Sequence, residues 1–290
     1  MLRGGVTGSF FALYIPAKLS NTEATDYAFV MLAELKKQMA SNTDKAAFAT
    51  NASEMAVNAS NGLVSVFLGL ENGSGLLGRA GVLQELYKEG VRYVTLCHSA
   101  DNDICDSCTG QGTWGGLSPL GRKLVGEMNE LGMTVDVAHT SNATVRDVLE
   151  LSKKPVAYTH GCCSSICSHK RNLPDDLIRG IASRGGVVCM SIFPCFLSDS
   201  FADYDDDNPD GRAMPEMDLV LDHIAHAVKV AGVEGVGFGT DYDGINHTAK
   251  GLESIEYFPR LVDGLEKRGY GMSDIEKMAS QNLLRVISGM

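Results

Sequence analysis

The sequence predicts an α/β fold of the (β/α)8 or TIM-barrel type, in which parallel strands alternate with helices. Short apolar runs alternate along the chain with segments of helical spacing, which is the pattern of repeated β-α units. Several of these runs end in a histidine or a carboxylate, as is typical of the catalytic end of such barrels. The chain has 290 residues, of which 44% are apolar, and this size suits one barrel. We therefore expect a single domain over residues 1–290.

The clearest β-α unit runs from Thr134 to His160. Its first apolar run stops at His139, Ser141 opens a helix, and a second apolar run starts at Pro155 and stops at His160. The crossover between parallel strands is right-handed, so both strands present their C-terminal ends on the same side of a sheet. We therefore expect the imidazoles of His139 and His160 to project into one pocket.

The other elements follow in chain order. Ser20 and Glu23 form a capping-box pattern that opens a helix. The buried stripe expected on this helix consists of Tyr27, Met31, Leu35 and Met39. Further strands are expected at residues 4–16, 63–70, 91–97, 186–191 and 235–239. Further helices are expected at residues 82–88, 119–131, 217–231, 255–267 and 273–286, with one more starting near Pro174.

The strand count falls one short of a closed barrel. The pattern gives seven barrel-type strands, whereas a closed barrel of this type has eight. Residues 46–49 form a further short apolar run. Either this run supplies the eighth strand or one strand is absent.

The composition argues against some classes of protein. A net charge of −11 disfavours nucleic-acid binding, because phosphates require a basic surface. No apolar run approaches the roughly 20 residues that cross a bilayer, and the start of the chain lacks the pattern of a signal peptide. We expect a cytoplasmic protein, or an exported one if its natural N-terminus lies upstream. The eight cysteines, two of them inside apolar runs, favour buried free thiols over a disulfide framework.

Five of the expected strands end in side chains that can carry chemistry. These residues are Glu71, His98, His139, His160 and Asp241. Imidazole nitrogen and carboxylate oxygen are ligands that zinc prefers, and a catalytic zinc keeps a position open for water. Glu71, His139 and His160 would bind one such ion, and the carboxylate could bridge to a second at about 3.5–4 Å.

Each candidate also has a purely structural interpretation. A histidine can simply end a strand, and Glu71 can be an ordinary turn carboxylate before Asn72 and Gly73. Asp241 lies in an Asp-rich loop, although its position directly after a strand favours function. Arg171 either pairs with a surface acid or captures a substrate carboxylate through two hydrogen bonds.

Other motifs are weaker. His223 and His226 lie on an expected helix without the H-E-x-x-H spacing of zinc peptidases, which favours a packing role. The acidic stretch 203–210 lacks the glycine and closing glutamate of an EF-hand and is expected to be a solvated loop that could act as a lid. Cys105 and Cys108 form a C-x-x-C motif without a second cysteine pair, which disfavours a structural zinc site. The absence of G-x-S-x-G, P-loop and G-x-G-x-x-G motifs disfavours serine-hydrolase and nucleotide chemistry.

Several segments together resemble a known family. They are GGVTGSFFALYIP, VFLGLENG, GVRYVTLCHSADNDICDS, GLSPLGRKLVGEMNELGMTVDVAHTS, VAYTHGCCS, SHKRNLPDD, GVGFGTDYDG and NLLRV. They extend from residue 4 to nearly the end and resemble the membrane dipeptidase family (renal dipeptidase type, peptidase family M19), a branch of the metal-dependent hydrolase barrels. The resemblance implies a dipeptide substrate and two zinc ions per protomer, and it leaves a homodimer as one option for the subunit number.

The resemblance also implies a role for each matching residue. Glu71 matches the carboxylate that bridges two zinc ions, and His139 and His160 match the histidines on the second zinc. His98 matches the histidine that helps to polarise the scissile carbonyl. Arg171 matches an arginine that contacts the substrate. Asp241 matches the aspartate that accepts and donates the proton at the bridging water.

One part of the family's pattern does not occur. In the family, a His-x-Asp motif on the first barrel strand binds the first zinc and precedes the segment GGVTGSFFALYIP. Only three residues precede that segment here, and no His-x-Asp occurs in the 290 residues. We therefore expect a barrel that is N-terminally truncated relative to the family, lacks its first strand and has an incomplete first-zinc site.

Two functional hypotheses follow. In the first, the chain is a zinc-dependent dipeptidase that cleaves the peptide bond with a metal-activated water. In the second, it is an inactive or single-metal truncated barrel that serves as a non-catalytic scaffold or binding module. The metal content of the purified chain distinguishes them.

Overall fold

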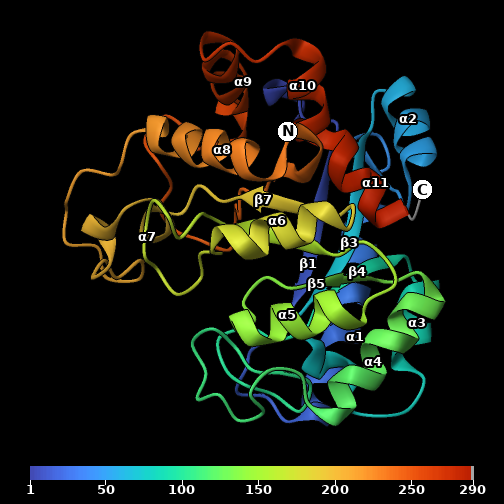
Figure 1. The fold of residues 1–290 in the computed structure, drawn as a ribbon. Coiled ribbons are helices and arrows are strands. Elements are labelled where there is room, and N and C mark those ends of the chain that lie inside the picture. Colours follow the sequence, from blue (N-terminus) through green and yellow to red (C-terminus); the bar gives the residue numbers. More distant parts are fainter. Residues whose placement is uncertain (289–290) are drawn as a thin grey trace. The chain divides into compact units, whose positions relative to one another are not determined.

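The computed structural model describes residues 1–288, which form two compact units. The amino-half unit comprises Thr7–Val156 together with the segment that begins at Leu284. The carboxy-half unit comprises Met1–Val6 and Ala157–Leu283. Figure 1 shows strands alternating with helices along the chain, as an α/β fold requires. The single domain expected over residues 1–290 stays a prediction.

The amino-half unit contains a parallel sheet in the order β1-β3-β4-β5. Its strands are β1 (Gly8–Tyr14), β3 (Val64–Glu71), β4 (Val91–Thr95) and β5 (Thr134–Asp136). In β3, every residue from Val64 to Leu70 is buried. This explains why the strand is a nearly continuous apolar run, because a parallel strand is covered on both faces. Glu71, at its end, is the first residue of the strand that is not fully buried.

A short strand, β2 (Ala46–Phe48), confirms the expectation at residues 46–49. It pairs with the start of β3, at Val64–Val66. Since β1 pairs along one edge of β3 from Ser65 to Glu71, β2 and β4 share the other edge. β2 therefore lies off the main path of the sheet and does not count as a barrel strand. The strand count is consistent with a barrel fold in which one strand is absent.

The helices of the amino-half unit are α1 (Asn21–Ala40), α2 (Ala52–Ser60), α3 (Val82–Lys88), α4 (Pro119–Leu131) and α5 (Asn142–Leu151). Two of them begin at the side chains expected to open them, Ser20 for α1 and Ser141 for α5. Ser20 and Glu23 form the predicted capping box of α1. Ser118 caps α4, which has proline in its first turn and ends at Gly132 in the left-handed conformation. α2 was not anticipated from the sequence.

The stripe predicted for α1 is wrong. The buried residues of this helix are Ala24, Thr25, Ala28 and Leu32, whereas Tyr27 is exposed. The Thr25 hydroxyl donates a hydrogen bond to the carbonyl of Gly75 at 2.8 Å. The helix thus packs mainly through small residues, one leucine and one buried hydrogen bond rather than through the predicted stripe.

The carboxy-half unit contains the parallel strands β6 (Ala157–Gly161), β7 (Val187–Met190) and β8 (Val236–Phe238), in that order. Its longer helices are α6 (Asp175–Ser183), α8 (Met217–Ala231) and α9 (Phe258–Lys267). A short helix, α7 (Pro194–Leu197), follows β7 and was not anticipated. The helix expected at residues 273–286 is divided into α10 (Met272–Glu276), a π-type turn (Lys277–Gln281) and α11 (Asn282–Ser288).

Two further expectations concern the described residues as a whole. All eight cysteines are free thiols, and all except Cys108 are buried. Burial raises the pKa of the Cys163 thiol to about 12, so this group stays protonated at neutral pH. Over residues 1–288, none of the helices combines the length and the apolar character that a membrane span requires.

Candidate active site

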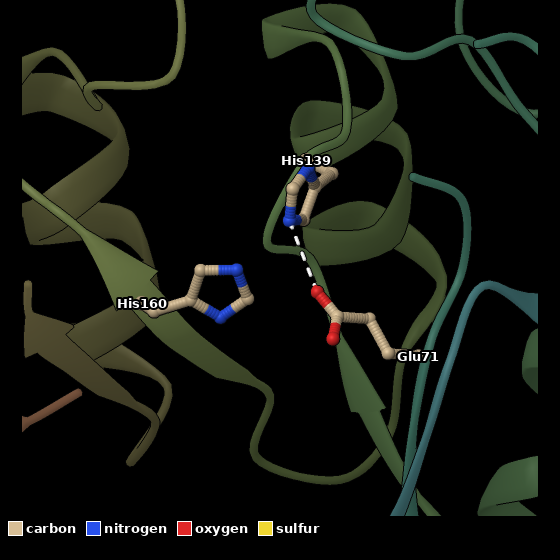
Figure 2. Close-up of side chains that lie close together, drawn as sticks. All are labelled: Glu71, His139 and His160. Atoms are coloured by element: carbon tan, nitrogen blue, oxygen red, sulfur yellow. Dashed lines mark ion pairs between the residues drawn. The ribbon is translucent and has the colours of Figure 1, made fainter. Parts of the chain in front are cut away.

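In the amino-half unit, Glu71, His98 and His139 contact one another. Oε1 of Glu71 lies 3.2 Å from Nε2 of His139 and 3.9 Å from Nε2 of His98. The ring centroids of the two histidines are 4.1 Å apart. Only 14% of the Glu71 side chain and 13% of the His139 side chain are exposed. Figure 2 shows the Glu71 carboxylate directed at the His139 ring. The strand-end pattern predicted that Glu71 and His139 lie together, and His98 is a further neighbour of the same carboxylate.

The turn after β3 fixes the direction of Glu71. Asn72 adopts φ 88° and is buried. Its side-chain amide donates to the carbonyl of Ile15 at 3.1 Å, and its side-chain oxygen accepts from the amides of Ser74 and Asn102. A Cβ atom on Gly73 would lie 2.8 Å from the carbonyl oxygen of Leu96, so this close turn requires glycine. The pair that follows Glu71 is therefore a fixed structural corner rather than a mobile turn.

His139 lies in a strained corner of the backbone. Its φ is 65°, in the left-handed region that non-glycine residues seldom adopt. One residue earlier in the turn, Ala138 donates its amide to Oδ1 of the buried Asp136, whose Oδ2 accepts from the Thr95 hydroxyl at 2.6 Å. The Thr95 bond connects the ends of β4 and β5, and the Ala138 bond closes the turn that leads to His139. The imidazole direction is thus set by the backbone and not by side-chain rotation alone.

Tyr14, at the end of β1, is a contact that the sequence reasoning missed. Its ring meets the His98 ring edge-on, with centroids 4.9 Å apart. Burial and the neighbouring Glu71 carboxylate raise the pKa of the Tyr14 hydroxyl. The available signal was its position, because Tyr14 ends a strand just as Glu71 does and pairs with it in register.

In the carboxy-half unit, His160 lies within β6, one residue before the end of the strand. It is 8% exposed, and its Nδ1 atom is 2.9 Å from the Thr159 hydroxyl. This contact fixes one nitrogen and orients the ring, which leaves Nε2 as the natural ligand atom. Figure 2 shows the His160 ring extending from its strand. The predicted position of His160 at the end of an apolar strand is confirmed.

Arg171 is buried, which contradicts the interpretation as a surface ion pair. Its guanidinium donates to the carbonyl of His160 at 2.9 Å and to the Tyr158 hydroxyl at 3.3 Å. The guanidinium carbon also lies 5.2 Å from the centre of the Phe196 ring. The arginine is held against the backbone of a candidate ligand, and its positive charge is largely withdrawn from water.

Asp241 follows β8 in a second left-handed corner, with φ 62°. Burial raises the pKa of its carboxyl to about 6, an effect that the Arg171 guanidinium opposes and the Asp206 carboxylate increases. The amide of Gly244 donates to the Asp241 carbonyl at 3.1 Å and closes the turn. A carboxyl with a pKa close to neutrality can both accept and donate a proton under physiological conditions.

The weaker candidates have structural roles. His223 is fully buried, accepts a hydrogen bond from the amide of Cys163 and contacts the carbonyl of Leu197. His226 pairs with Asp175 at 2.8 Å. Both observations confirm that these histidines serve packing and polar contacts.

The acidic stretch 203–210 is held by internal contacts. Arg212 pairs with Asp203 and Asp210, and Asp206 accepts hydrogen bonds at 2.7 Å from the Asn246 amide and at 2.9 Å from the His247 ring. The stretch is therefore tied to the loop that follows Asp241.

Comparison with known proteins identifies the family. The model of the membrane dipeptidase family (Peptidase family M19) matches residues 1–290. The chain belongs to this family. Dipeptidase verJ of Clonostachys rogersoniana is 33% identical over 299 residues, which cover 99% of this chain and 74% of that protein. Dipeptidase aclJ of Aspergillus oryzae is 36% identical over 227 residues, which cover 78% of this chain and 51% of that protein.

Solved peptidase structures have the same fold. A metallo peptidase from Rhodobacter sphaeroides, solved with a phosphinate mimic of the dipeptide L-Ala-D-Ala, has a TM-score of 0.87 at 23% identity. The match covers 99% of this chain and 88% of that one. The predicted barrel-type fold is thereby confirmed. The matched regions span only about half the length of some curated relatives, including aclJ at 51%.

Proposed function

We propose that this chain is a zinc-dependent dipeptidase in which Glu71, His139 and His160 bind the metal. Family membership supports a metal-dependent dipeptidase. The observation that carries the proposal is the pairing of the Glu71 carboxylate with the His139 imidazole at 3.2 Å, at the ends of parallel strands. Each of the three side chains offers one ligand atom.

The donor set fits the ion. Two imidazole nitrogens and one carboxylate oxygen form the ligand set of several catalytic zinc sites, which keep a further position for water or substrate. Bound zinc would polarise the scissile carbonyl and lower the pKa of a water molecule. The chain contains no His-x-Asp motif, so these residues provide ligands for one ion. A second ion would require ligands beyond this set.

The remaining candidates have roles in substrate binding and proton transfer. His98, which stands beside His139, would donate a hydrogen bond to the oxygen of the scissile carbonyl. Arg171 would attract the carboxylate of the dipeptide through its buried positive charge. Asp241, with a pKa of about 6, would accept the proton of the attacking water and donate it to the leaving amine.

The stereochemistry of the substrate can be tested together with the activity. The Rhodobacter sphaeroides peptidase binds a mimic of L-Ala-D-Ala. We propose dipeptides as the substrate class of this chain and include both L-Ala-L-Ala and L-Ala-D-Ala in the assay.

The test is hydrolysis of these dipeptides by the purified 290-residue chain after removal of metal with a chelator and after addition of zinc. Activity should appear only with zinc, and Glu71→Gln should abolish it together with zinc binding. Glu127→Gln is the matched control, because Glu127 is a half-exposed glutamate that pairs with Lys123. Zinc binding without hydrolysis would favour the scaffold hypothesis, and absence of both would refute the proposal.

A further inference from the structure

The loop between β4 and α4, residues 96–118, joins the backbones of two proposed site residues. The Ser107 hydroxyl lies 2.6 Å from the carbonyl oxygen of His98 and 3.2 Å from that of His139. Ser107 is only 4% exposed, and its oxygen accepts a hydrogen bond from the amide of Thr109 at 3.3 Å. A single buried hydroxyl therefore contacts the main chain at the ends of two neighbouring strands.

The next residue reinforces this connection. The amide of Cys108 donates to the carbonyl of His139 at 2.8 Å, so residues 107 and 108 both bind the same oxygen. His139 has a positive φ, a strained conformation for a non-glycine residue that persists only when its surroundings hold it. Without these donors, the peptide of His139 could rotate toward a relaxed conformation. The imidazole would then move away from Glu71.

Asp101 holds Ser107 in place. Its Oδ1 atom accepts the amide of Ser107 at 2.8 Å. Its Oδ2 atom accepts the amides of Gln111 and Thr113 and the Thr113 hydroxyl, at 2.7–3.1 Å. Burial opposes ionisation of Asp101, but these hydrogen bonds prevail and lower the pKa of its carboxyl. The loop is thus organised around a carboxylate that is ionised at neutral pH, and Ser107 is fixed before any ligand binds.

We propose that Ser107, supported by Asp101, is a positioning residue that sets the spacing of the His98 and His139 imidazoles around Glu71. Only the expected effects of Ser107 variants on zinc affinity and kcat rest on the proposed function. The arrangement itself is a property of the metal-free chain. Ser107 acts through two backbone carbonyls.

The test compares Ser107→Ala with Ser107→Thr and with a matched control, Ser118→Ala. Ser118 is a buried serine in the same loop, and its hydroxyl donates to the carbonyl of Asp103 at 2.6 Å and caps α4. Its removal should lower the melting temperature without displacing either histidine. Ser107→Thr keeps the hydroxyl and should restore whatever Ser107→Ala loses.

The first measurement is imidazole NMR of the metal-free chain. Ser107→Ala should shift the ring resonances of both His98 and His139, whereas Ser118→Ala should leave both unchanged. Unchanged resonances in Ser107→Ala would overturn the inference, whether or not the chain binds zinc. This measurement therefore separates failure of the inference from failure of the proposed function.

The second measurement uses the zinc-loaded chain. Loss of an outer partner of a metal ligand typically reduces metal affinity or activity by about 10–100-fold. Ser107→Ala should reduce zinc affinity and kcat by roughly tenfold or more, with a smaller change in KM, and Ser118→Ala should change each less than about twofold. Equal losses in the two alanine variants would mean that Ser107 has only a general structural role.

Discussion

The two units place functional residues at left-handed corners in different ways. In the amino-half unit, the carbonyl of His139 is held by donors from a separate loop, and its ring lies against Glu71. In the carboxy-half unit, the corner at Asp241 is closed locally by the amide of Gly244, three residues later. The first corner depends on long-range contacts, whereas the second depends mainly on its own turn.

The difference also concerns charge. The amino-half site assembles donor atoms in direct contact, which suits a metal ion. The carboxy-half site surrounds Asp241 with a buried environment that keeps its proton until about pH 6. We infer that Glu71 and His139 in the first region act mainly as ligands, whereas the corner at Asp241 in the second region serves proton transfer. Substitutions of His139 and of Asp241 should therefore separate metal binding from rate.

The largest effect is expected for His139→Ala. Loss of a direct ligand should reduce zinc affinity by more than the roughly 10–100-fold attributed to outer partners, and hydrolysis should fall with it. Zinc titration against a competing chelator measures the first quantity and a dipeptide assay the second. His226→Ala is the control, because His226 pairs with Asp175 outside the proposed site. Normal zinc affinity in His139→Ala would refute its assignment as a ligand.

Asp241→Asn should reduce kcat while zinc binding stays intact. General acid-base groups typically contribute about 10²–10⁴-fold to rate, and a loss of this size is expected. Steady-state kinetics and zinc analysis of the same preparation provide the measurement. A variant that loses zinc in proportion to its rate would show that Asp241 acts as a ligand, and the contrast between the two regions would fail.

The same substitution should change the stability of the metal-free chain in a pH-dependent way. The folded pKa of about 6 lies above the ordinary value of 3.8, so the folded state retains a proton that the unfolded state has lost. Stability therefore falls as the pH rises from about 4 to 6. Asp241→Asn should equal the parent chain near pH 4 and exceed it above pH 6, by on the order of 2–3 kcal/mol. Urea unfolding at both pH values measures the difference.

A smaller effect is expected for Thr159→Val, which removes the hydroxyl next to Nδ1 of His160. Zinc affinity should fall by about tenfold because the ring loses its orienting partner. Thr25→Val is a suitable control, since Thr25 also has a buried hydroxyl that donates to a backbone carbonyl. If both variants bind zinc like the parent chain, the Thr159 contact does not orient a ligand.

Much of the fold could be predicted because local signals determine it. The bounds of α3, α4 and α8 agree with the sequence pattern, and α4 begins at a capping serine followed by proline. The buried stripe of α1 could not be predicted, because its small residues face a neighbouring segment and Thr25 bonds to Gly75 there. The division of the last helix by a π-type turn also has no local sequence signal.

The candidate site was predictable to a similar extent. Glu71, His98 and His139 were found from their positions at strand ends, and the structure brings them into contact. Ser107 was not found, because it contacts backbone carbonyls. Every residue has a backbone carbonyl, so such a contact leaves no signal in the sequence. The burial of Arg171 was also hidden, since an arginine in a polar loop has the same pattern whether it is exposed or enclosed.

The burial of Val64–Leu70 in β3 has a consequence for how the proposed site is lost on unfolding. Amide hydrogens in a strand with no solvent-facing side should exchange among the slowest in the amino-half unit, while those of residues 96–118 should exchange earlier. Partial opening of residues 96–118 would therefore release His98 and His139 from Glu71, while Glu71 remains anchored at the end of β3. Recovery of function after mild denaturation would then require only that the loop return to an intact strand.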